Sequence, residues 1–182
     1  MSNDLIRKVS EHDSGGILDI YSYYIENTVT TFEIETPALD SFADKIKSIS
    51  EAYPFFVYSA DDVIVGYAYA SKHHERAAYC YNVDVSVYIK NDMCNKGIGS
   101  KLYSTLFDEL ATQNYYNAYA LITLPNEGSI ALHRKFGFNE IGTHKKTGYK
   151  FGKWIDVLWL EKTIKEHNEI SVDIDSNGII IS

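Results

Sequence analysis

The stretch VDVSVYI (residues 83–89), followed by KGIG (residues 96–99) and an apolar helical pattern, decides the fold of this chain. The alternation of β-branched and polar residues predicts a strand, and the glycine pair predicts a tight loop from which a helix departs. The first turn of such a helix has free backbone N–H groups and a partial positive charge. Gly97 and Gly99 have no side chain, so an anion can approach the backbone closely. The unit therefore predicts a binding site for a phosphate or pyrophosphate group.

Two common phosphate-binding motifs do not fit this loop. A P-loop ends in Gly-Lys-Ser/Thr, and a dinucleotide-binding fingerprint has three glycines after the first strand of a βαβ unit. Here two glycines occur in mid-chain, and the preceding strand alternates instead of being apolar throughout. By itself the loop is therefore also compatible with an ordinary helix N-terminus.

The composition excludes several classes of protein. With 182 residues and 45% hydrophobic content, the chain is predicted to be one domain with a sizeable core. A net charge of −8 argues against general binding to nucleic acid or to an acidic membrane, because both need a basic surface. No stretch approaches the roughly 20 apolar residues of a membrane span, and no signal peptide is visible. The two cysteines have no metal-binding spacing and fit a reducing cytoplasm, so we expect a cytoplasmic protein without a metal.

Hydrophobic periodicity predicts an α+β domain with the element order β-α-α-β-β-β-α-β-α-β-β. Strands are expected at residues 5–9, 55–59, 63–70, 78–89, 118–124, 138–146 and 149–160, and helices at 17–25, 37–49, 98–112 and 127–135. Pro37 is expected in the first turn of the second helix. The apolar strand at 118–124 is expected to be buried on both faces. Residues 165–182 are expected to form either a hairpin or a disordered tail.

Four motifs occur in order along the chain: RxxY (76–79) ahead of VDVSVYI, KGIGxxLY (96–103), LPNxxSxxLHxxxGF (124–138) and GYKxGxWxDV (148–157). Together they resemble the GNAT superfamily of acetyl-CoA-dependent N-acetyltransferases, and within it the phosphinothricin and amino-acid N-acetyltransferases. The resemblance covers about residues 5–162. It implies a single GNAT domain, residues 1–164, with a mixed, mostly antiparallel sheet of about seven strands and helices on both faces. Residues 165–182 are then a C-terminal extension. The implied reaction moves an acetyl group from acetyl-CoA to the amine of a small amino acid or analogue, in a homodimer.

The resemblance also assigns the glycine loop to the pyrophosphate of CoA. The implied CoA contacts are Val85, Val87, Asn95, Lys96, Gly97, Ile98, Gly99, Ser100, Asn126 and Ser129. The loop of the family usually begins with Gln or Arg, but Cys94 stands at that position, so a side-chain donor is lost and weaker CoA binding is expected. Asn126 is also a favoured helix N-cap residue, and the two roles are compatible.

Acetyl transfer to an amine needs a group that accepts the proton of the amine. Asp84 lies in mid-strand on the polar face, and the resemblance implies a general base at this position, where the family usually has Glu. Asp is shorter by one carbon–carbon bond, roughly 1.5 Å, which a water molecule can bridge. The alternative for Asp84 is an exposed strand residue with local hydrogen bonds. His133 stands where many GNAT enzymes carry a tyrosine that protonates the thiolate; the alternative, a histidine satisfied in the packing, is equally open.

Four residues are expected on the acceptor side. Arg76 and Tyr79 lie just before Asp84, and a guanidinium pairs well with carboxylate, phosphinate or sulfone oxygens; the alternative is a surface arginine. Phe32 and Glu33 lie between the first two helices, in the loop that the resemblance implies as the acceptor-side wall. Two other functions stay open at this point. One is acetylation of a polyamine, an aminoglycoside or a protein N-terminus, and the other is CoA binding without turnover.

Overall fold

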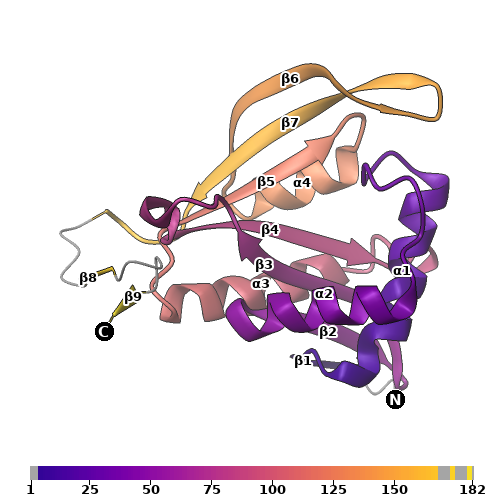
Figure 1. Cartoon of the computed structure of the whole chain (residues 1–182), viewed down its shortest axis with the longest axis horizontal. Coiled ribbons are helices and arrows are strands. Elements are labelled where there is room, and N and C mark those ends of the chain that lie inside the picture. The colour runs from indigo at the N-terminus through magenta and orange to yellow at the C-terminus, as the bar shows by residue number, and fades with distance from the viewer. Residues whose placement is uncertain (1–3, 168–172, 175–179, 182) are drawn as a thin grey trace.

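The computed structural model describes residues 4–167, 173–174 and 180–181 (Figure 1). The main sheet contains β1 (Asp4–Lys8), β2 (Phe55–Ala60), β3 (Val63–Lys72), β4 (Asn82–Ile89), β5 (Asn117–Thr123), β6 (Asn139–Lys150) and β7 (Lys153–Thr163). The helices are α1 (Ser14–Asn27), α2 (Leu39–Ala52), α3 (Ile98–Thr112) and α4 (Glu127–Lys135), with short 3-10 helices η1 (Glu11–Asp13), η2 (Ala77–Tyr79) and η3 (Asn91–Met93). The predicted order of elements is confirmed, as are the seven strands of the sheet.

The sheet order is β1-β2-β3-β4-β5-β7-β6, and each neighbouring pair is antiparallel except β4 and β5. These two parallel strands pair over only three residues each, and the last pair joins Asp84 to Tyr119. Both strands continue beyond it, β4 to Ile89 and β5 to Thr123. Figure 1 shows them diverging toward their C-terminal ends. The backbone groups that face each other beyond Asp84 are therefore outside the ladder of the sheet.

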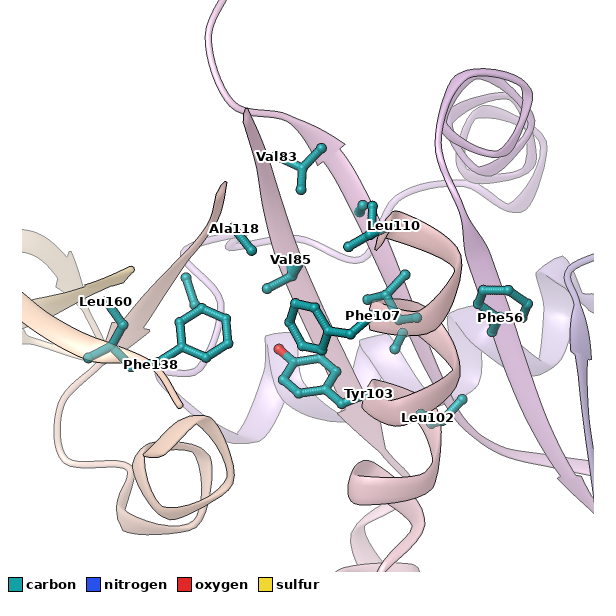
Figure 2. Close-up of a cluster of buried hydrophobic side chains, with 14 of the residues drawn as sticks. Phe56, Val83, Val85, Leu102, Tyr103, Phe107, Leu110, Ala118, Phe138 and Leu160 are labelled. Atoms are coloured by element: carbon teal, nitrogen blue, oxygen red, sulfur yellow. The ribbon is translucent and has the colours of Figure 1, made fainter. Parts of the chain in front are cut away.

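Two apolar layers cover opposite faces of the sheet. On one face α3 and α4 pack over a large cluster, and Figure 2 shows Val83 and Val85 of β4 facing Tyr103 and Phe107 of α3. On the other face α1 and α2 pack over β2 and β3. Because side chains alternate along a strand, Asp84 lies on this second face of β4. Tyrosines gather here: Tyr21, Tyr24, Tyr67, Tyr69 and Tyr88.

Two of the element boundaries that differ from the predictions change the place of a named residue. β4 begins at Asn82 instead of residue 78, because Ala77–Tyr79 forms a 3-10 turn in which Cys80 N donates to Ala77 O at 3.0 Å. Tyr79 is therefore not part of the strand. Helix α2 begins at Leu39, so Pro37 precedes the N-cap, Ala38, and does not lie in the first turn.

The second half of the sheet is more exposed than expected. Along most of β5 only one face is buried: Ala118, Ala120 and Ile122 are buried, whereas Leu121 on the other face is 47% exposed. β6 and β7 form one long hairpin that projects beyond the rest of the sheet (Figure 1). The hairpin turns at Phe151 and Gly152, which have positive φ angles of 50° and 74°, instead of near residue 147.

In the C-terminal extension, β8 (Asp173–Ile174) pairs with β9 (Ile180–Ile181) in antiparallel fashion. The expectation of a hairpin or a disordered tail also covers residues that lie outside the described ones, namely 168–172, 175–179 and 182. Among the helices that the structure describes, none combines the length and the apolar character needed to cross a bilayer.

Candidate active site

A narrow cavity of about 50 Å³ lies between the diverging strands. Its wall includes Val85, Ser86, Val87 and Tyr88 of β4, Leu121 and Thr123 of β5, Tyr103 of α3, and Asn126, Ser129 and His133 at α4. Four of the predicted CoA contacts, Val85, Val87, Asn126 and Ser129, thus meet in one place. The Oγ1 atom of Thr123 is buried and has no hydrogen-bond partner in the described structure. A polar ligand threaded between the strands would supply that partner.

The glycine loop has the geometry of an anion site at the start of α3. Gly97 is the N-cap residue with φ 79°, and Asn95 also has a positive φ, 61°. Lys101 N donates to Gly97 O at 3.1 Å. The amides of residues 98–100, among them Ile98 and Ser100, come before it and so have no acceptor inside the helix. These three N–H groups and the helix dipole favour a phosphate group.

Gly99 lies where α3 packs closely against α4. A Cβ atom at this position would lie 3.1 Å from Leu132 Cδ2 of α4. An added Cβ would require the Leu132 side chain to shift by a few tenths of an ångström, so glycine lets α3 and α4 pack at this distance without that adjustment. Asn126 caps α4, since its Oδ1 accepts a hydrogen bond from Ser129 N at 3.1 Å, and it lines the cavity too. Both roles predicted for Asn126 are therefore sterically compatible.

Two lysines add positive charge near this loop. Lys135, at the end of α4, donates to Ser100 Oγ at 3.0 Å, and Lys96 lies in the loop with its Nζ 3.1 Å from Met93 Sδ. Sequence reasoning missed Lys135, because its distance from Ser100 depends on how α4 packs on α3. Cys94 is exposed, and its Sγ lies 3.7 Å from Lys90 O. The open amides, the two lysines and the unpaired Thr123 hydroxyl fit a diphosphate group joined to a chain that runs between β4 and β5.

Asp84 has a partner that sequence reasoning missed. Its Oδ1 lies 2.7 Å from Nδ1 of His73, in the connection after β3. The side chain of Asp84 is 32% exposed and that of His73 is 10% exposed. Burial raises the pKa of Asp84, and the hydrogen bond from His73 opposes that rise. The sequence contains two adjacent histidines, His73 and His74, just after β3. Only the strand register, which places Ser71 opposite Asp84, shows that the first of them can reach Asp84.

His133 is held inside the protein by two partners. His133 is only 3% exposed. Its Nδ1 atom lies 2.7 Å from Ser129 O, and its Nε2 atom lies 2.9 Å from the hydroxyl of Tyr103. Because a carbonyl oxygen can only accept, Nδ1 carries the proton and Nε2 accepts from Tyr103. Burial lowers the pKa of His133, which favours this neutral form. The geometry fits the second of its two interpretations, a histidine satisfied in the packing.

The loop between α1 and α2 is attached to the β6–β7 hairpin. Lys150 is 4% exposed, and its Nζ donates to Thr31 O at 2.8 Å. The ring of Phe32 lies against Gly148, so closely that a Cβ atom there would be 2.0 Å from Phe32 Cζ. Glu33 is on the outer side of the loop, 3.8 Å from Nζ of Lys45. The hairpin therefore fixes where Phe32 stands.

Arg76 and Tyr79 line a different and larger cavity of about 830 Å³, together with residues from the C-terminal end of α2. The ring of Tyr79 lies 5.9 Å from that of His73, which bonds Asp84. The structure thus places Tyr79 close to Asp84 through His73, whereas Arg76 shares the larger cavity with Tyr79 and makes no hydrogen bond or ring contact with His73 in the described structure. Phe32 and Glu33 come from the opposite direction, where Thr30 of their loop lines the narrow cavity.

Comparison with known proteins agrees with this geometry. Residues 6–159 match the acetyltransferase (GNAT) domain. The chain is 36% identical over 163 residues to a phosphinothricin N-acetyltransferase of Streptomyces coelicolor, covering 87% of this chain and 95% of that protein. It is 29% identical over 163 residues to an L-methionine sulfoximine/L-methionine sulfone acetyltransferase of Salmonella typhimurium, covering 89% and 95%. A phosphinothricin acetyltransferase from Sinorhizobium meliloti, solved in complex with acetyl-CoA, superimposes with a TM-score of 0.85 at 32% identity over 88% of each chain.

The fold, the parted strands with the glycine loop at α3, and these matches over most of the chain agree on one assignment. The chain belongs to the GNAT acetyltransferase family and is an acetyl-CoA-dependent N-acetyltransferase.

Proposed function

We propose that this enzyme acetylates the α-amine of a small amino acid or analogue of the phosphinothricin or methionine sulfone type. The observation that carries the proposal is the position of Asp84, a partly buried carboxylate at the point where β4 and β5 separate. The names of the relatives support the acceptor class. Arg76 supports it as well, because a guanidinium at the rim of the larger cavity suits an anionic acceptor side chain.

The roles follow from the placement of the residues. Acetyl-CoA supplies the acetyl group as a thioester. We assign its diphosphate to the amides of residues 98–100 with Lys96 and Lys135, and its thioester arm to the cavity beside Val85 and Val87. We assign the donor for the thioester carbonyl oxygen to backbone N–H groups of this part of β4.

Asp84 accepts a proton from the amine as the N–C bond forms and the C–S bond breaks. The leaving thiolate takes up one proton from water, and Asp84 returns the proton that it accepted to water, so the step is balanced. We assign His133 and Tyr103 to shaping the thiol end of the cavity, since burial opposes the charged form that an acid role for His133 requires.

Two further statements belong to the same proposal. We place the enzyme in the cytoplasm, because Cys80 and Cys94 are free thiols that suit a reducing compartment.

We also propose a homodimer. Large apolar side chains stand exposed on the β5–β6–β7 half of the sheet, namely Leu121, Ile141, Tyr149, Phe151 and Trp154. A second copy of the chain would bury them.

The test measures thiol release from acetyl-CoA with a panel of amines: amino acids, methionine sulfone, phosphinothricin and polyamines. We expect turnover with the amino-acid analogues, and a fall in kcat of roughly 100-fold or more in Asp84→Asn. Asp92→Asn, a carboxylate on the exposed η3 turn, is the control and should be unaffected. Turnover only with polyamines would reject the acceptor class, and an unchanged Asp84→Asn would reject the base. CoA binding without turnover of any amine in the panel would also reject the acceptor class.

A further inference from the structure

His73 occupies an unusual place at the mouth of the gap between β4 and β5. It follows β3 directly, and its ring turns back over the sheet to stack on Tyr119 with centroids 4.2 Å apart and planes 15° apart. Tyr119 is the last β5 residue that pairs with β4, and its partner in that pair is Asp84. The imidazole therefore lies beside the point where the strands separate.

The ring of His73 is confined by aromatic neighbours. Besides the face of Tyr119, it meets His74 edge-on at 4.9 Å and Tyr79 at 5.9 Å. Its side chain is 10% exposed. A ring held in this way has little rotational freedom, so Nδ1 keeps a fixed direction toward Asp84.

The bond from His73 to Asp84 has a defined polarity. An ionised carboxylate can only accept hydrogen bonds, so Nδ1 of His73 is the donor to Oδ1 at 2.7 Å. A carboxylate bound at one oxygen cannot rotate freely, and the other oxygen is then aimed in a constant direction. General-base catalysis depends on such aim, because proton transfer needs hydrogen-bond distance and alignment.

We propose that His73 is a positioning residue, which orients the carboxylate of Asp84 for proton transfer by donating Nδ1–H to it. The inference rests on the proposed role of Asp84 as general base. It assigns a function to a side chain outside the sequence motifs, and it implies that the proton of the amine is accepted by Asp84 and not by the imidazole.

Two substitutions separate donation from proton acceptance. His73→Phe keeps a ring to stack on Tyr119 but has no N–H group. His73→Asn places an amide nitrogen at the same δ position, so it can donate to Asp84 but cannot titrate. We expect His73→Phe to lower kcat about 10- to 100-fold, the range found when a hydrogen-bond partner that orients a metal-ligating side chain is removed. His73→Asn should retain most of the activity, and the KM for acetyl-CoA should be unchanged in both variants.

The pH profile adds a readout that a merely structural role would not change. The ionisable groups facing Asp84 are His73 and His74 from the β3–β4 connection, Tyr69 from β3 and Tyr119 from β5. The hydrogen bond from His73 lowers the pKa of Asp84, so its loss lets burial raise that pKa further. Because a base must be deprotonated, the acidic limb of kcat should move to higher pH in His73→Phe and less in His73→Asn. The same acceptor is used throughout, so that the ionisation of its amine is common to all profiles.

The outcomes decide between the two roles. If His73→Asn loses as much activity as His73→Phe, the imidazole itself takes the proton and the proposal is overturned. If both variants are fully active with an unmoved profile, His73 does not position the base. A readout without turnover is the Nδ1–H resonance of ¹⁵N-labelled His73, which should shift in Asp84→Asn. Loss of activity in the wild type toward every amine would reject the proposed function, whereas an unshifted resonance would reject the hydrogen bond itself.

Discussion

The contact between Phe32 and Gly148 allows a sharp test of the acceptor-side wall. In Gly148→Ala, the new Cβ would lie 2.0 to 2.5 Å from three carbon atoms at the far end of the Phe32 ring. Such distances are far below van der Waals contact, so one of the two groups must move. The ring belongs to a loop residue that is 40% exposed, whereas Gly148 lies in β6, so we expect the ring to swing away.

The structure sets the size of the effect. Full burial of a phenylalanine side chain contributes about 1.5–3 kcal/mol, so a ring that is more than half buried contributes about 1–2 kcal/mol. The free energy of unfolding should fall by no more than this amount. If Phe32 forms the acceptor-side wall, the acceptor loses its contact with the ring when the ring moves away. A loss of about 1–2 kcal/mol in acceptor binding raises the KM for the acceptor about 5- to 30-fold. The KM for acetyl-CoA should not change.

The assay is steady-state kinetics with phosphinothricin or methionine sulfone, together with thermal unfolding. Gly142→Ala is the matched control, because Gly142 is in the same strand and its Cβ would meet nothing within 4 Å. A second control places Gly148→Ala in a Phe32→Ala background, where it should have no further effect. An unchanged acceptor KM in Gly148→Ala would refute the role of Phe32, and an equal loss in the Phe32→Ala background would show that the strand and not the ring is responsible.

Three other predictions follow from the site and its surroundings. Burial lowers the pKa of His133, so the unfolded chain binds more protons than the folded one below the ordinary pKa of about 6.5, and stability is lost as the pH falls. Thermal scans from pH 7 to 5 should show this loss in the wild type but not in His133→Gln, and a basic limb of kcat that disappears in the variant would instead establish His133 as an acid. Lys135→Ala should raise the KM for acetyl-CoA by up to about fivefold and weaken its salt dependence, while Lys165→Ala, at the other end of α3, should leave both unchanged. Trp154→Glu should convert the dimer into monomers, which light scattering measures. A wild-type protein that is monomeric at all concentrations would contradict the proposed interface.

The sequence predicts most of the fold because local signals agree with one another. The strands expected at residues 55–59 and 63–70 leave room only for a tight turn between them, and Asp61 and Asp62 have positive φ angles of 47° and 65° there. The apolar stripe from Ile98 to Leu110 predicts a helix with one buried face, which α3 confirms. Predicted element boundaries were wrong where the local sequence is compatible with more than one backbone conformation. The run of residues 77–81 fits a strand or a turn, and the bonds of η2 decide for the turn.

The residues of the candidate site also differ in whether local sequence signals could locate them. The glycine loop and Asn126 could be located from the chain alone, since helix N-termini bind anions through the backbone and asparagine caps helices locally. The partners of Asp84 and His133 could not. His73 and Asp84 are eleven residues apart, and Tyr103 and His133 are thirty apart, so each contact depends on the packing of separate elements.

The sequence by itself therefore determined the order of elements, the glycine turn at Gly97 that begins α3 and the carboxylate on the polar face of β4, because each depends on periodicity or on the conformational freedom of one residue. Only the tertiary structure decided that β4 and β5 separate after Asp84, that Lys135 joins the loop at Ser100, and that His73 bonds Asp84. These features come from strand register and helix packing, which bring together side chains that no local pattern connects.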